Sequence, residues 1–195
     1  MVKSPCLMAE DYNERWPERP HLHYEAGWLT GVWMIGNNYR NVTRFYGAYP
    51  RSLLERYSVT FESGGERILH LFSGSLPRGP YTRFDVKQAA DVQGDAHELA
   101  RALHRAGYRE FDIIYADPPY SEDDAKRYGT PMVDRRQVLH ECFKVLDRRG
   151  ILVWLDTQVP QYRKTEFQHF GTIAVIRSCN QRVRVVSVFR KVVSR

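Results

Sequence analysis

The residues of this chain best suited to chemistry are Asp117, Pro118, Pro119 and Tyr120, which place a carboxylate and an aromatic ring in one short segment. They follow residues 113–116, whose apolar and β-branched character predicts a buried parallel strand. Because proline neither donates to a strand ladder nor fits a helix interior, the strand must run into a stiff loop. Ligands bind at the carboxyl ends of strands in open α/β sheets, so this loop is the first candidate site. The alternative is a plain strand-ending turn, because Asp-Pro commonly opens turns.

This quartet resembles the catalytic motif of S-adenosylmethionine-dependent amino-methyltransferases, which methylate the exocyclic amine of adenine or cytosine in DNA, with some relatives acting on RNA. An aromatic amine is a poor nucleophile because its lone pair is delocalised into the ring. The resemblance implies that Asp117 and the carbonyl of Pro118 accept the two N–H groups and free that lone pair, with the prolines holding the backbone. It also implies that a flipped-out base stacks on Tyr120. In that family an Asp at the first position favours adenine and a Ser favours cytosine.

Residues 67–80 predict a buried strand that runs into a glycine turn, and they resemble the family's cofactor motif, acid-x-Phe-x-Gly-x-Gly. Phe72 and Gly74 fit that motif. His70 stands where the acid is usual and Leu76 where the second glycine is usual, so the cofactor's ammonium group loses an expected partner. The candidate cofactor contacts in this segment are His70, Phe72, Ser73, Gly74 and Ser75.

Two acids close the next two predicted strands. Asp85 ends residues 81–86, where a carboxylate can accept both hydroxyls of a ribose, although a turn aspartate is the simpler alternative. Asp95 ends a short strand that begins at residue 91, and the resemblance implies that it binds the adenine amine of the cofactor, with Ala96 beside it. Asp117 is expected to contact the cofactor as well. An aromatic-glycine segment holds the methionine end of the cofactor in the family, and the matching residues here are Phe45, Tyr46 and Gly47.

The linker between the first two of these strands is unusually short. A parallel crossover normally needs a dozen or more residues, and Pro77, Gly79 and Pro80 would break a helix there. We therefore expect a trimmed first crossover, made by an extended loop.

A net charge of +6 favours a polyanionic partner. Residues 27–49 interleave aromatic rings with arginines, which suits nucleic acid, but the rings could equally pack onto the sheet. Residues 121–131 start like a capped helix and are expected to lie over the catalytic loop. A turn at residues 178–182 could bind phosphate or remain solvated. The candidate nucleic-acid contacts in these segments are Arg40, Arg44, Tyr128, Arg177, Asn180 and Arg182.

Alternating strand and helix patterns predict an α/β fold with a Rossmann-like, mostly parallel sheet and a C-terminal antiparallel hairpin. We expect one domain over residues 1–195, with an N-terminal arm and aromatic segment over 1–44 and a catalytic core over 45–195. Residues 1–26 show no clear period and predict an irregular arm. The expected helices span residues 52–57, 98–105 and 134–147, and the expected later strands span residues 151–155, 172–177 and 183–189.

Composition limits the class of protein. No apolar run is long enough to cross a membrane, and the N-terminus lacks a signal-peptide pattern, so a cytoplasmic protein is expected. Cys6, Cys142 and Cys179 are far apart, which predicts reduced thiols and no metal site.

Over residues 45–190 the chain resembles small phage- or prophage-type DNA methyltransferases. That resemblance implies S-adenosylmethionine as cofactor, direct methyl transfer to adenine N6, and no metal. Few residues remain for a large target-recognition domain, so weak or short sequence specificity is expected. An RNA or free-nucleobase amine methyltransferase stays open. A non-catalytic nucleic-acid-binding relic also stays open, because His70 and Leu76 depart from the motif. The oligomeric state is not predicted.

Overall fold

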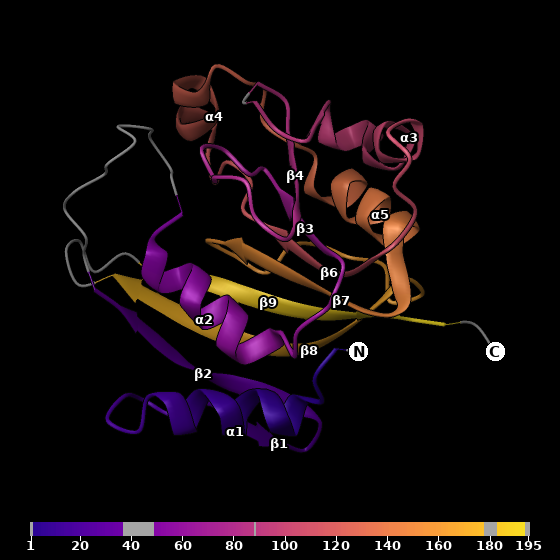
Figure 1. Cartoon of the computed structure of the whole chain (residues 1–195). Helices are drawn as coiled ribbons and strands as arrows, with labels where there is room; N and C mark the ends of the chain where they lie inside the picture. Colours follow the sequence, from indigo (N-terminus) through magenta and orange to yellow (C-terminus); the bar gives the residue numbers. More distant parts are fainter. Residues whose placement is uncertain (1, 37–48, 88, 178–182, 194–195) are drawn as a thin grey trace.

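The computed structural model describes residues 2–36, 49–87, 89–177 and 183–193. These residues form one nine-stranded sheet in the order β1-β2-β8-β9-β7-β6-β3-β4-β5 (Figure 1). The strands are β1 (His23–Glu25), β2 (Trp28–Ile35), β3 (Ile68–Leu71), β4 (Thr82–Asp85), β5 (Val92–Gln93), β6 (Phe111–Ala116), β7 (Leu146–Asp156), β8 (Phe167–Arg177) and β9 (Val183–Lys191). The helices are α1 (Pro5–Arg15), α2 (Arg51–Phe61), α3 (Leu99–Arg105), α4 (Glu122–Tyr128) and α5 (Arg135–Val145), with a 3₁₀ turn, η1 (Ala96–Glu98), before α3.

The central strands run parallel, as the sequence predicts. β5, β4, β3, β6 and β7 pair in parallel along the sheet. β9 then runs antiparallel between β7 and β8, which confirms the expected C-terminal hairpin. This is the mostly parallel Rossmann-like sheet expected from the sequence.

Helices cover both faces of the sheet, with α1 and α2 on one side and α3 and α5 on the other (Figure 1). Strand β6 shows how its side chains divide between the two cores. Ile113 and Tyr115 belong to the core beneath α1 and α2, whereas Ile114 and Ala116 belong to the core beneath α3 and α5. Because both faces are buried, the stretch from Ile113 to Ala116 in β6 is a continuous run without charged residues.

The first crossover is trimmed. Residues 72–81, all of which the structure describes, contain no helix and connect β3 to β4 through turns. The buried guanidinium of Arg83 donates to the carbonyl of Leu76 at 2.9 Å and pairs with Asp91 at 2.9 Å. These bonds from β4 hold the loop where a helix would otherwise pack.

The expectation of an irregular N-terminal arm was wrong, because residues 5–15 form helix α1. Pro5 occupies its first turn, and the hydroxyl of Ser4 caps it by accepting the N–H of Leu7 at 3.3 Å. Met8 and Tyr12 lie one turn apart and are fully buried. Two apolar residues one turn apart are too few to predict an amphipathic helix from the sequence. The helix is stabilised by packing onto the sheet.

The predicted end of the helix over residues 134–147 was also wrong. Helix α5 stops at Val145, and β7 starts at Leu146, five residues before the expected strand. Gly150 belongs to the strand because β7 passes close to β6 there. A Cβ atom on Gly150 would lie 2.9 Å from the carbonyl oxygen of Asp112. The other predicted helices and strands are present, with ends shifted by a few residues.

No helix in the part of the chain that the structure describes is long and apolar enough to cross a membrane. Of the cysteines, Cys6 is exposed and Cys142 is buried in the core, both as free thiols, while Cys179 lies outside the described residues.

Docking of α1 leads to a stability prediction. Met8→Ala should lower the free energy of unfolding by about 2–5 kcal/mol, because it leaves a cavity at a fully buried position. Leu7→Ala is the matched control, since Leu7 is 41% exposed on the same helix and should change stability by less than about 0.5 kcal/mol. Urea unfolding measures both. Equal effects of the two substitutions would show that α1 does not dock on the sheet.

Candidate active site

The carboxyl ends of β3, β4, β5 and β6 open into one cavity of about 820 Å³. Gly74 follows β3, Asp85 ends β4, Asp95 follows β5 and Asp117 follows β6, and all four residues line it. The volume falls within the usual range for small-molecule sites. The sheet therefore brings together residues that lie up to 43 positions apart in the sequence.

Most of the predicted site residues within the described chain lie on the wall of this cavity. They are Phe72, Gly74, Asp85, Asp95, Ala96, Asp117, Pro118, Pro119, Tyr120, Tyr128 and Arg177. Three predicted cofactor residues, His70, Ser73 and Ser75, are not part of the wall. The remaining predicted contacts lie outside the described residues: Arg40, Arg44, Phe45, Tyr46, Gly47, Asn180 and Arg182.

His70 is a packed core residue. It is 4% exposed, and its ring lies against Tyr49, Tyr81 and Tyr115 at centroid distances of 5.7, 4.7 and 5.0 Å. Burial lowers the pKa of His70 to about 3, so the imidazole is neutral at physiological pH. The side chain at this position therefore supplies no charge to the cavity.

The glycine turn after β3 is held by a carboxylate. Gly74 has a φ of +52°, a conformation that favours glycine, and its N–H donates to Oδ2 of Asp85 at 2.9 Å. The other oxygen of Asp85 accepts the N–H of Lys87 at 2.9 Å. Phe72, on the cavity wall, has a φ of +63° although it carries a side chain, and such strain concentrates at functional sites. Asp85 thus shapes the turns at the ends of two strands.

Asp95 is oriented by a histidine whose tautomer the structure determines. The backbone N–H of Asp134 donates to Nε2 of His97 at 2.9 Å, so Nε2 must accept. In the neutral ring the proton then lies on Nδ1, which donates to Asp95 at 2.7 Å. The backbone N–H of His97, and then this side-chain bond, lower the pKa of Asp95. His97 therefore links the end of β5 to the start of α5.

Asp117 is the first residue of the loop that follows β6. Its Oδ1 accepts a short hydrogen bond from the hydroxyl of Tyr120. Burial raises the pKa of Asp117 to about 6, against the lowering effects of that hydrogen bond and of Arg184. The group is therefore a carboxylate at neutral pH that takes up a proton on mild acidification.

Arg184 is a site residue that the sequence reasoning missed. It comes from the start of β9, lines the cavity, and places its guanidinium carbon 4.4 Å from the centroid of the Tyr120 ring. This cation–π contact occupies one face of the ring on which a base was expected to stack. The sequence of β9 did mark Arg184, because it is a charged residue among apolar strand residues. The sequence pattern does not say which residues the Arg184 side chain contacts.

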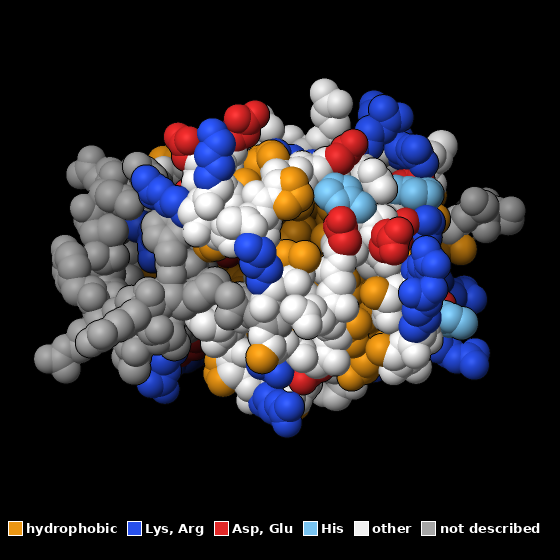
Figure 2. Space-filling model, turned by 90° about the horizontal axis from the view of Figure 1, so that it is seen from above, with side chains coloured by type: hydrophobic (Ala, Val, Ile, Leu, Met, Phe, Trp, Pro, Cys, Tyr) orange, Lys and Arg blue, Asp and Glu red, His pale blue; other side chains and the backbone are white. Residues whose placement is uncertain are grey.

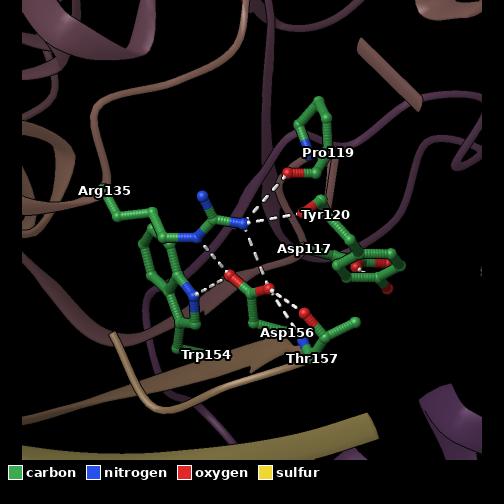
Figure 3. Close-up of polar contacts among 7 residues, drawn as sticks. All are labelled: Asp117, Pro119, Tyr120, Arg135, Trp154, Asp156 and Thr157. Atoms are coloured by element: carbon green, nitrogen blue, oxygen red, sulfur yellow. Dashed lines mark hydrogen bonds and ion pairs between the residues drawn. The ribbon is translucent and has the colours of Figure 1, made fainter. Parts of the chain in front are cut away.

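A second cluster lies behind the catalytic loop (Figure 3). Asp156, at the end of β7, is fully buried and pairs with Arg135 of α5 at 2.6 Å. Nη2 of Arg135 also donates to the carbonyl oxygens of Tyr120 at 3.1 Å and Pro119 at 3.5 Å. The sequence placed Asp156 at a strand end and Arg135 in a helix, but nothing in it paired the two.

Helix α4 starts directly after the catalytic loop and lies against the cavity, as expected for residues 121–131. Ser121 caps it by accepting the N–H of Asp124 at 3.1 Å, and Gly129 ends it with a φ of +64°. Asp124, Tyr128 and Thr130 line the cavity.

Charges around the cavity are mixed. Lys87, Arg177 and Arg184 line it together with four aspartates. Figure 2 shows Lys and Arg side chains in separate groups over one face, with acidic and His side chains gathered between some of them. In the described parts of the chain, no group of three or more His, Cys, Asp or Glu side chains is arranged to hold a metal ion.

No family model matches this sequence, and no curated protein matches it either. Solved structures do. SMU.776, assigned as a methyltransferase and crystallised with SAH, is 12% identical with a TM-score of 0.50, over 88% of this chain and 56% of that one. TrmN from Thermus thermophilus is 18% identical with a TM-score of 0.46, over 66% of this chain and 44% of that one. The chain thus spans about half the length of these two proteins. At such low identity the likeness to SMU.776 shows a shared α/β fold and nothing of function.

The raised pKa of Asp117 predicts a pH-dependent stability difference. The carboxyl titrates near 3.8 when unfolded and near 6 when folded, so the native state binds more protons between these values. Wild type should therefore gain stability relative to Asp117→Asn as the pH falls from 7 to 4, by up to about 3 kcal/mol. Urea unfolding of both proteins across this range measures the difference. A difference that is constant with pH would contradict the burial of this carboxylate.

Proposed function

We propose that this chain is an S-adenosylmethionine-dependent methyltransferase that transfers a methyl group to the exocyclic N6 amine of adenine in DNA. The observation that carries the proposal is that the loop 117–120 lines the same cavity as Gly74, Asp85 and Asp95. A catalytic loop and three predicted cofactor contacts from four strands meet in one space. Their spatial agreement supports the motif resemblance, which rests on sequence.

The residues at this edge of the sheet fit the cofactor. Asp85 ends β4 on the cavity wall, where a carboxylate would accept the hydroxyls of a ribose. The hydroxyls of Ser73 and Tyr49 are buried with no hydrogen-bond partner among the described residues. Ser73 directly precedes Gly74, which lines the cavity, so a polar ligand bound there would offer a partner to the Ser73 hydroxyl.

The catalytic loop provides acceptors for an amine. When bound, S-adenosylmethionine supplies the activated methyl group. Asp117 would accept one N–H of the base through its carboxylate, and the carbonyl of Pro118 would accept the other. The pKa of about 6 keeps Asp117 ionised at neutral pH, and protonation at lower pH would remove an acceptor. The loop thus acts by orienting and polarising the amine.

The target is proposed from charge and from the motif. Arg177 and Arg184 line the cavity from the terminal hairpin, and Lys87 lines it from the other side, so phosphates of a bound strand would meet cations near the base pocket. Tyr128 adds an aromatic side chain on the α4 side. In the resembled family an Asp at the first position of the quartet, here Asp117, favours adenine. The lining of the cavity would suit a base in RNA as well as one in DNA, so methyl transfer to DNA and to RNA must be compared directly.

A non-catalytic nucleic-acid-binding relic is the second candidate. It is favoured by the neutral, buried His70 at the position where the family carries an acid. It is also favoured by the bond that already joins Asp117 to Tyr120. Calorimetry with S-adenosylmethionine separates the two functions, because a relic has no reason to retain the cofactor.

Asp117→Ala should reduce methyl transfer from labelled S-adenosylmethionine to DNA by at least about a thousandfold, because the amine loses its charged acceptor. The affinity for the cofactor should fall by less than about tenfold, since Asp117 is only one of its proposed contacts. Asp123→Ala, which removes an exposed carboxylate from the neighbouring helix α4, is the control and should keep full activity. Activity retained in Asp117→Ala would rule out the mechanism.

Asp85→Asn and Asp95→Asn should each weaken S-adenosylmethionine binding by about tenfold or more, because each removes a charged acceptor and the stronger hydrogen bonds it makes. Isothermal calorimetry measures the affinity, and circular dichroism checks the fold. Asp123→Asn again serves as control. If both variants bind like wild type, the cofactor does not lie along the ends of β4 and β5.

A further inference from the structure

Arg135 makes a forked set of contacts at the back of the catalytic loop (Figure 3). Its Nε and Nη2 donate to the two oxygens of Asp156 at 2.6 and 3.2 Å. The same Nη2 turns toward the loop and donates to the carbonyl oxygens of Tyr120 and Pro119 at 3.1 and 3.5 Å. One guanidinium therefore ties two peptide groups of the quartet to the end of β7.

The anchor of this fork is itself held firmly. Asp156 is fully buried, and its oxygens also accept Nε1–H of Trp154 at 3.2 Å, the N–H of Thr157 at 2.7 Å and the hydroxyl of Thr157 at 3.3 Å. Trp154 is buried as well, inside the core under α5. A carboxylate with this many donors has little freedom to rotate, so Arg135 is held in a defined position.

The hydrogen bonds from Arg135 to the loop restrict a backbone angle, ψ, that the proline rings leave free. A proline ring fixes φ, but ψ remains free, and ψ sets the direction in which the carbonyl points. The two loop carbonyls that accept hydrogen bonds from Arg135 belong to Pro119 and Tyr120. Holding them fixes the peptide groups that follow Pro119 and Tyr120, and with them the part of the loop that carries the Tyr120 hydroxyl to Asp117. The charged fork supplies the constraint that the proline rings cannot.

We infer that Arg135 is a positioning residue of the catalytic loop, anchored by Asp156, which aims the acceptors of the loop without contacting the base. This inference rests on the proposed function. The planar guanidinium suits the role because it can donate to a carboxylate and to carbonyls at the same time. The start of α5 is also connected to the proposed cofactor side of the cavity. The N–H of Asp134 donates to His97, and His97 in turn orients Asp95.

Arg135→Lys is the informative variant. Lysine keeps a positive charge opposite buried Asp156, so the protein should fold, but a single ammonium cannot reproduce the fork. We expect the single-turnover rate of methyl transfer to fall by about 10- to 100-fold, because small misplacements of reacting groups have effects of this size. The dissociation constant for S-adenosylmethionine should stay within about threefold of wild type, since Arg135 is not on the cavity wall. This split between rate and affinity separates positioning from general damage.

Two further variants complete the design. Arg136→Lys is the matched control, because Arg136 is the next residue of α5 and is exposed, and it should behave like wild type. Arg135→Met combined with Asp156→Asn removes the fork without leaving a buried unpaired charge, and it should lose rate at least as much as Arg135→Lys. A wild-type rate in Arg135→Lys would overturn the inference, and so would equal losses of rate and cofactor affinity.

A readout without catalysis separates this inference from the proposed function. Amide hydrogen exchange of peptides covering residues 116–124 reports on how tightly the loop is held. Exchange there should become faster in Arg135→Lys and stay unchanged in Arg136→Lys. If wild type transfers no methyl group yet the exchange responds as expected, the proposed function fails and the clamp on the loop stands. Unchanged exchange in Arg135→Lys would overturn the clamp whatever the activity.

Discussion

Parallel pairing of the central strands is the constraint on which the site depends. Because β3, β4, β5 and β6 run the same way, all their carboxyl ends meet at one edge of the sheet. The turns that leave those strands carry Gly74, Asp85, Asp95 and Asp117, and a single cavity collects them. A change in the direction of any one strand would send its turn to the opposite edge. The chemistry of the site therefore follows from the topology before any side chain is considered.

Carboxylates serve this site in different ways, and their surroundings decide which. Asp85 accepts hydrogen bonds from two backbone N–H groups and so shapes the turns after β3 and β4. Asp117 lines the cavity, and burial raises its pKa to about 6. Asp156 lies outside the cavity wall, fully buried and surrounded by donors, where it anchors Arg135. Two features thus constrain the loop at residues 117–120: its two proline rings, and the hydrogen bonds from Arg135, which pairs with Asp156.

Local patterns predicted the parts of the fold in which neighbouring residues carry the information. The apolar run before Asp117, the terminal hairpin and the trimmed first crossover were all predicted, because strand content and proline or glycine punctuation act within a few residues. Helix α1 escaped prediction, since its stripe of Met8 and Tyr12 is short and becomes stable only against the sheet. The end of α5 was predicted wrongly because a glycine after a helix usually marks its C-terminal cap. Gly150 instead lies where β6 and β7 come too close together for a side chain.

By itself, the sequence determined the order of strands and helices from α2 to β9, the stiff acidic loop after β6, and the set of acids at strand ends. It could do so because each of these depends on residues adjacent in the chain. Only the tertiary structure decided that Arg184 lies over Tyr120, that His70 is buried among aromatic rings, and that Arg135 joins Asp156 to the catalytic loop. The pairing of Arg135 with Asp156 spans 21 positions and two elements, and no spacing rule within one helix or one strand specifies such a contact.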